Sequence, residues 1–134
     1  MKDLIWDKSL SVEVDEIDED HQKLIKLFNL INYALVEGDS PEYIEALLDE
    51  LISCTAWHFK HEERLMLKYA YAGLEEHRKE HNDLIQSAIE LKNTLSQEET
   101  FTLTNENIDF LERWLTGHIL GADMELGTFL GETM

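Results

Sequence analysis

The sequence has few cysteines and few basic residues, and these shortages exclude several classes of protein. Its single cysteine, Cys54, cannot form an internal disulfide, which is typical of a reducing compartment, so we expect a cytoplasmic protein. Only 11 Lys and Arg stand against 29 Asp and Glu, and the net charge of −18 repels nucleic acid and anionic membrane surfaces. The opening residues lack the apolar run of a signal peptide, and no stretch approaches the ~18–20 apolar residues of a membrane span. We therefore expect no nucleic acid and no membrane among its partners.

The length of 134 residues and the hydrophobic content of 43% are sufficient for one domain with its own core. We expect a single domain over residues 1–134. Residues 1–17 carry apolar side chains without helical spacing and are expected to form an irregular N-terminal arm that packs over the domain, with Trp6 as its anchor. Residues 18–134 are expected to form the helical body.

Apolar residues recur at steps of three and four along four segments, which predicts four amphipathic helices. Their expected ranges are about 18–38, 41–69, 74–95 and 105–119. Ser40 and Pro41 are a typical cap and first-turn pair, and Thr104 or Asn105 should cap the last helix. Because the connections are short, consecutive helices should run antiparallel. The predicted fold is all-α, an up-down-up-down antiparallel four-helix bundle.

Five of the six histidines fall in phase with the apolar stripes and should point into the core: His21, His58, His77, His81 and His118. Glu62 lies one helical turn beyond His58, and Asp123 lies five residues beyond His118, so two carboxylates should reach the same depth. A carboxylate buried without a partner costs several kcal/mol, and buried neutral imidazoles also need partners. A cation between these seven side chains would satisfy all of them.

The spacing of these residues determines which of them can converge. His58 and Glu62 are one helical turn apart, as are His77 and His81, so each pair projects from one helix face. Asp123 does not share this spacing, because five residues turn an ideal helix ~140° away from its starting face. We therefore expect the helix to distort or end between residues 118 and 123, with a bulge or loosened turn at Gly121, to which Gly117 could contribute.

A single histidine on an apolar stripe is more often a hydrogen-bonded core residue than a ligand, but seven in-phase polar groups on four helices favour a metal site. His61 and Glu63 are out of phase and should lie in solvent or behind the ligands, and Cys54 should behave as a small hydrophobic residue. Seven ligands exceed the needs of one ion, which favours a dinuclear centre bridged by Glu62 and Asp123. Imidazole and carboxylate donors suit iron, with manganese or zinc as alternatives.

At these residues the sequence resembles the hemerythrin family, specifically its single-domain bacterial members, over almost the whole chain. The matching elements are Trp6, the approach 17–21, the segment 58–66 (HFKHEERLM), His77-x-x-x-His81, Trp114-x-x-x-His118-Ile119 and Asp123. The resemblance implies a non-haem centre of two iron ions (Fe2+/Fe3+) with a bridging oxo or hydroxo group. One iron would be bound by His77, His81 and His118, the other by His21 and His58, and both by Glu62 and Asp123.

The second iron would then keep one coordination position open for dioxygen. The family's apolar O2 pocket corresponds here to Leu24, Phe59, Trp114 and Ile119. The resemblance implies reversible dioxygen binding for storage or delivery, and we expect a carrier of dioxygen rather than an enzyme. Three alternatives remain: an O2 or redox sensor, which would show ligand-dependent partner binding; an oxidase, peroxidase or nitric oxide scavenger, which would show turnover; and a structural zinc bundle, which metal analysis would reveal.

Overall fold

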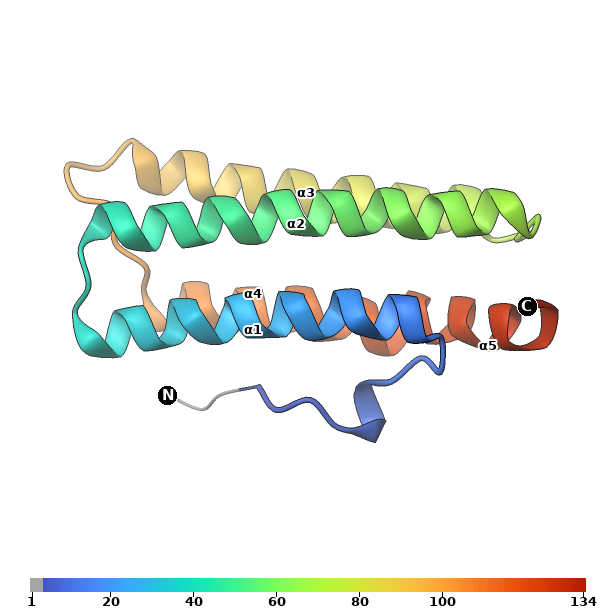
Figure 1. Ribbon diagram of the computed structural model, residues 1–134. Helices are drawn as coiled ribbons and strands as arrows, with labels where there is room; N and C mark the ends of the chain where they lie inside the picture. Colours follow the sequence, from blue (N-terminus) through green and yellow to red (C-terminus); the bar gives the residue numbers. More distant parts are fainter. Residues whose placement is uncertain (1–3) are drawn as a thin grey trace.

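Helices make up nearly all of the structure, a computed structural model that describes residues 4–134 (Figure 1). The elements are η1 (Lys8–Leu10), α1 (Asp15–Glu37), α2 (Pro41–Lys68), α3 (Leu74–Ser96), α4 (Asn105–His118), η2 (Ile119–Asp123) and α5 (Met124–Thr133). No strand occurs between residues 4 and 134. Within that range, no helix combines the length and the apolar character that a membrane span requires.

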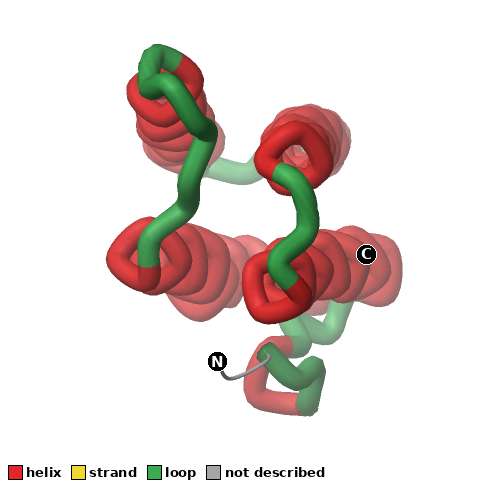
Figure 2. Tube along the Cα trace, turned by 90° about the vertical axis from the view of Figure 1, so that its left-hand side faces the viewer, coloured by secondary structure: helices red, strands yellow, loops and turns green. Residues whose placement is uncertain are grey.

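Helices α1 to α4 form an antiparallel four-helix bundle, as the sequence predicts. Seen along the helices, the four rods occupy the corners of a square (Figure 2). Helix α1 packs beside α2 and α4, and α2 also packs beside α3. Helix α5 continues in the direction of α4 through η2 at one end of the bundle (Figure 1).

The helix boundaries follow from local capping chemistry. Gly38 adopts φ 71° and ends α1, a left-handed conformation that costs glycine little. The Ser40 side chain caps α2 by accepting a hydrogen bond from a backbone amide, and Pro41 occupies the first turn, where its missing N–H is not needed. Thr104 and Asn107 form a reciprocal capping box at the start of α4.

Helix α1 begins at Asp15, three residues before the expected start at residue 18. The acidic side chains of the first turn favour an early start, because they interact well with the positive end of the helix dipole. Asp18 also ties the arm to the helix, accepting hydrogen bonds from the Ser11 hydroxyl (2.6 Å) and the Val12 amide (2.9 Å). Ile17, which we expected in the arm, is therefore a buried residue of the first helical turn.

Residues 4–14 of the N-terminal arm pack against the bundle, whereas residues 1–3 of the expected arm lie outside the described residues. Trp6 is half-buried against the main core, while the more completely buried anchors are Leu10, Val12 and Val14. The backbone of Leu4 makes two hydrogen bonds to the side chain of Asn29, at 2.9 and 2.8 Å. A Cβ at Gly127 would meet the Val12 carbonyl oxygen at 2.4 Å, so only glycine allows the arm to approach α5 this closely.

The last helical segment widens between His118 and Asp123. Residues Ile119–Asp123 form one turn of π-helix, in which hydrogen bonds join residues five apart. This wide turn confirms the expected distortion around Gly121, whereas Gly117 stays in regular α-helix. Since a spacing of five residues now makes about one turn, the side chains of His118 and Asp123 can face the same interior point.

Candidate metal centre

Seven polar side chains meet in the interior of the bundle, and none is more than 5% exposed. They come from every long helix and from the wide turn: His21 on α1, His58 and Glu62 on α2, His77 and His81 on α3, His118 on α4 and Asp123 on η2. Their ligand atoms form two overlapping groups that share Glu62 and Asp123. The predicted inward direction of the five histidines is confirmed by this burial.

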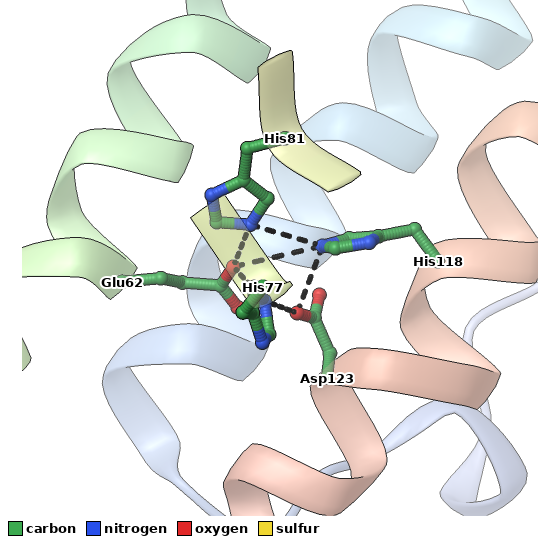
Figure 3. A group of neighbouring side chains, drawn as sticks. All are labelled: Glu62, His77, His81, His118 and Asp123. Atoms are coloured by element: carbon green, nitrogen blue, oxygen red, sulfur yellow. Dashed lines mark hydrogen bonds and ion pairs between the residues drawn. The ribbon is translucent and has the colours of Figure 1, made fainter. Parts of the chain in front are cut away.

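The larger group contains three imidazoles and the two shared carboxylates (Figure 3). Nε2 of His81 lies 3.0 Å from Oε1 of Glu62. Nε2 of His77 and Nε2 of His118 lie 3.0 and 2.9 Å from Oδ1 of Asp123. Nε2 of His81 and Nε2 of His118 are only 3.2 Å apart. We call this set the three-histidine half.

The smaller group contains two imidazoles and the same two carboxylates, and we call it the two-histidine half. Nε2 of His21 lies 2.8 Å from Oδ2 of Asp123, and Nε2 of His58 lies 3.4 Å from Oε2 of Glu62. The two Nε2 atoms are 3.0 Å apart. Each carboxylate therefore directs one oxygen toward each half, which is the arrangement that a bridging ligand needs.

The chemistry of these atoms fits bound cations. All five imidazoles present Nε2 to the centre, and two pairs of ring nitrogens face each other at hydrogen-bond distance. Oε2 of Glu62 and Oδ2 of Asp123 are buried and accept no hydrogen bond of good geometry from the described part of the chain, although Nε2 atoms lie nearby. Buried acceptors without donors are rare in proteins unless an ion or water satisfies them. Nitrogen and oxygen donors in this proportion suit a divalent transition metal.

The charges of the centre are balanced by protons when no metal is bound. Burial lowers the pKa of His58, but the carboxylates of Glu62 and Asp20 outweigh it and raise the pKa to about 9. Burial is likewise outweighed at His77 and His118, where Asp123 and Glu62 raise the pKa to about 9 and about 11. Burial alone would raise the pKa of Glu62, but the imidazoles around it, His58 above all, hold that pKa well below its usual range. A metal ion would take the place of these protons.

Carboxylates outside the centre hold several of the imidazoles from behind. Nδ1 of His58 donates a hydrogen bond to Oδ2 of Asp20 (2.8 Å), and Nδ1 of His81 donates one to Oε2 of Glu63 (3.1 Å). A proton on Nδ1 leaves the lone pair of Nε2 free to face a metal ion, so these contacts select the ligating tautomer.

Two of the other imidazoles, those of His118 and His21, have weaker contacts at Nδ1. Nδ1 of His118 lies 3.1 Å from Oε1 of Glu80, an ion pair that lacks hydrogen-bond geometry. Nδ1 of His21 is buried and has no hydrogen-bond partner among residues 4–134. The orientation of His21 therefore depends on packing and on what its Nε2 contacts.

The two out-of-phase residues lie behind the ligands, one of the two expected positions. Glu63 is buried and contacts His81 as well as Nε of Arg78, at 3.3 Å. His61 links Asp20 to the surface, since Nδ1 of His61 lies 2.6 Å from Oδ2 of Asp20 and Nε2 lies 2.8 Å from Oε1 of Glu16. The sequence analysis did not single out Asp20 or Glu80. They could have been identified from the rule that a metal-ligating imidazole usually donates a hydrogen bond from its outer nitrogen, here Nδ1, to a carboxylate or carbonyl.

A small cavity of about 10 Å³, which we call the inner cavity, adjoins the two-histidine half. All four residues expected to form an O2 pocket line it, namely Leu24, Phe59, Trp114 and Ile119. His21, His58, His118 and Asp123 of the centre also line the inner cavity, and so do Thr55 and Leu115, which the sequence analysis did not include. Thr55 lies three residues before His58 and Leu115 three before His118, so both share a face with a histidine of the centre.

The polar groups in the wall of the inner cavity are turned toward the backbone. The Thr55 hydroxyl donates to the carbonyl oxygen of Leu51 (2.6 Å), and the Trp114 indole N–H donates to that of Leu84 (2.8 Å). The ring of Phe59 stacks on that of His81, with centroids 3.8 Å apart and planes 4° apart. The space is therefore apolar on every side except where it meets the centre.

Comparison with known proteins agrees with this geometry. Residues 12–130 match the family model of the hemerythrin HHE cation-binding domain. A hemerythrin-like protein from Naegleria gruberi is 32% identical over 120 residues, covering 90% of this chain and 87% of that protein. Bacteriohemerythrin from Stenotrophomonas maltophilia (strain R551-3) is 29% identical over 120 residues, covering 90% and 76%. A crystal structure of wild-type hemerythrin superposes with a TM-score of 0.84 at 26% identity, covering 93% of this chain and 95% of that one. The chain belongs to the hemerythrin family.

Proposed function

We propose that this chain, as a single hemerythrin domain, binds two non-haem iron ions and carries dioxygen reversibly, for storage or delivery. Membership of a cation-binding family and the buried set of imidazole and carboxylate donors support iron. Iron, when bound, supplies the electrons that reversible binding of dioxygen requires. The name bacteriohemerythrin, given to a relative, agrees with this assignment.

In this proposal, the three-histidine half holds one iron through His77, His81 and His118, and the two-histidine half holds the other through His21 and His58. Glu62 and Asp123, each with one oxygen toward either half, would be shared between the two ions. The division is supported by the two overlapping groups of ligand atoms, which share only these carboxylates. The iron of the two-histidine half would have one protein ligand fewer and would be the one that dioxygen reaches.

The observation that carries the proposal is the position of the inner cavity. It is lined by both imidazoles of the two-histidine half, His21 and His58, but by only one of the three-histidine half, His118. Its volume of about 10 Å³ is close to the smallest space that admits one water-sized molecule. An apolar pocket of this size excludes water and organic substrates, so it favours a small, weakly polar ligand.

The residues of the inner cavity favour carriage over turnover. Oxidation of an organic substrate would need room for that substrate, and release of reduced dioxygen would need a proton donor beside the ligand. The hydroxyl of Thr55 and the indole N–H of Trp114 are both engaged with backbone carbonyls. Apart from the histidines that would hold the iron, the lining residues thus hold no free proton for the ligand, which slows its irreversible reduction.

Optical spectra of the iron-loaded protein test the proposal. The protein is reduced, exposed to dioxygen and then degassed, and its iron content is measured in parallel. We expect an oxygenated spectrum that returns to the reduced one on degassing, with two irons per chain. Irreversible passage to the ferric form would contradict carriage and favour sensing or oxidase chemistry, and zinc in place of iron would point to a structural site.

A further inference from the structure

A second, larger space lies on the outer side of the centre, between α1 and α2. This cleft has a volume of about 290 Å³ and is open to solvent. It is lined by Asp20, Lys23, Leu24, Ser53, Cys54, Trp57 and His58. Trp57 is 58% exposed, and Lys23 and Ser53 are also exposed, so these residues mark its mouth.

The cleft and the inner cavity share two wall residues, Leu24 and His58. Everything else that lines the inner cavity belongs to that cavity alone. Leu24 is 2% exposed and His58 is 1% exposed, so both are closed toward solvent. Two side chains therefore separate an open, partly apolar cleft from the space beside the centre.

These two side chains differ in their freedom to move. The imidazole of His58 is held on both sides, by Asp20 at Nδ1 (2.8 Å) and by its contacts at Nε2 with His21 (3.0 Å) and Glu62 (3.4 Å). Leu24 has no polar group and is held by packing alone, and aliphatic side chains change rotamer even inside folded proteins. Leu24 is the part of the wall that can open.

We propose that the cleft between α1 and α2 is the route by which small neutral ligands reach the inner cavity, with the side chain of Leu24 as its gate. The ligand class is a weakly polar diatomic molecule, because the inner cavity is apolar and close to the smallest space that holds one water-sized molecule. The proposal rests on the proposed function for the identity of the ligand, but the route itself depends only on the two spaces and their shared wall. Cys54 lines the cleft and not the inner cavity, so a group attached there would obstruct the route without touching the bound ligand.

Thiol labelling tests the route without reference to dioxygen. In a Cys54→Ser background, one variant carries Leu24→Cys and a matched variant carries Leu115→Cys, both at buried positions that line the inner cavity. Only residue 24 also faces the cleft, so a small methanethiosulfonate reagent should modify it about tenfold faster than residue 115, as measured by mass spectrometry. Equal rates, or faster reaction at residue 115, would overturn the proposal.

Ligand kinetics test the gate in the iron-loaded protein. A bulky maleimide attached to Cys54 should slow the binding and the release of dioxygen by the same factor, about tenfold, and leave the equilibrium constant unchanged. The matched control is the Cys54→Ser/Thr128→Cys protein with the same label, because Thr128 is an exposed residue of α5. Control rates should equal those of the unlabelled protein.

The outcomes separate this inference from the proposed function. If the unlabelled protein forms no reversible dioxygen complex, the proposed function fails, and the labelling comparison still decides the route. If dioxygen binds reversibly but the label on Cys54 leaves both rates unchanged, the assignment of the cleft and Leu24 as the route and its gate is wrong. Should the labelled protein lose its helical circular dichroism, a smaller maleimide on Cys54 provides the same kinetic test, with both rates expected to fall by one common factor.

Discussion

The two halves of the centre use the same two carboxylates and differ in what surrounds them. The three-histidine half borders the inner cavity through His118 alone, and the ring of Phe59 covers His81 at 3.8 Å. The two-histidine half has one imidazole fewer and borders both the inner cavity and, through His58, the cleft. The more enclosed half can hold an ion firmly, whereas the half that borders both spaces can accept a ligand. The asymmetry lies in the histidine count and in the packing beside it.

Removal of a shared carboxylate should have the largest effect, because it acts on both halves. Glu62→Ala deletes a ligand atom from each group and leaves the surrounding imidazoles without their central anion. We expect iron content to fall from two ions per chain to near zero, as measured by metal analysis of the purified protein. Retention of one ion per chain would show that the halves bind independently.

Loss of a ligand from one half should distinguish that half from its neighbour. His77→Ala removes an imidazole from the three-histidine half only, and we expect about one iron per chain to be lost. His61→Ala is the control, because His61 belongs to neither group that shares Glu62 and Asp123. Its iron content should stay near that of the unmodified protein. Equal losses in the two variants would mean that the ligand face of the helices is misassigned.

The pH dependence should reflect protons on both halves. The pKa of His58 and of His77 is raised to about 9, and that of His118 to about 11, from 6.5 in the unfolded chain, so the metal-free centre is protonated at neutral pH. Metal binding must displace these protons, and apparent affinity should rise between pH 6.5 and 9 by up to about tenfold per pH unit for each proton displaced. Calorimetry in buffers of different ionisation enthalpy counts the protons released.

Whereas metal affinity should rise with pH, the stability of the metal-free protein should fall. A raised histidine pKa stabilises the folded state below pH 6.5, and this contribution is lost as pH rises through about 9 for His58 and His77. Urea unfolding of the metal-free protein should therefore give a lower midpoint at pH 9 than at pH 6.5. A midpoint that rises over this interval would contradict the charge balance assigned to the centre.

The outer carboxylates should tune the two halves separately and less strongly. Asp20→Asn weakens the hydrogen bond to His58 in the two-histidine half, and Glu63→Gln weakens that to His81 in the three-histidine half. Each should lower the metal affinity of its own half by about 10–100-fold, as measured by competition with a chelator. If both variants lost affinity at the same half, the pairing of these carboxylates with the histidines would be wrong.

The smallest effect is expected at Gly121 in the wide turn. A Cβ there meets nothing within 4 Å, and its backbone is not in the left-handed region. Gly121→Ala should keep the iron content unchanged and raise the free energy of unfolding by about 0.5–1 kcal/mol, because alanine favours helical backbone more than glycine does. Loss of iron would mean that the turn requires glycine to aim Asp123.

The sequence predicts the bundle and the convergence of its buried polar residues because both follow from helical periodicity. His21, His77 and the other inward histidines are recognisable by their phase with leucines and isoleucines, and the wide turn follows from the five-residue spacing of His118 and Asp123. The early start of α1 at Asp15 was missed, because the acidic first turn adds little to the apolar pattern.

Features that depend on the space between helices could not be predicted in this way. Asp20 and Glu80 lie off the apolar stripes, and only the outward direction of each Nδ1 reveals their partners. The shared wall at Leu24 depends on how far α1 and α2 are separated locally, a distance that side-chain volumes set after packing. Helical periodicity predicts which face of a helix carries a residue, but it does not predict the shape of a space between two helices.

The wide turn also affects the far end of the molecule. One residue added to a helical turn rotates all that follows by about 100° about the axis. Beyond Asp123, Leu126 and Leu130 thereby join the second apolar cluster, in which they pack with Val12 and Val14 of the arm. A deletion that restored regular helix would thus turn Asp123 away from the interior. It would also turn Leu126 and Leu130 away from Val12 and Val14, so that the arm would lose its packing against α5.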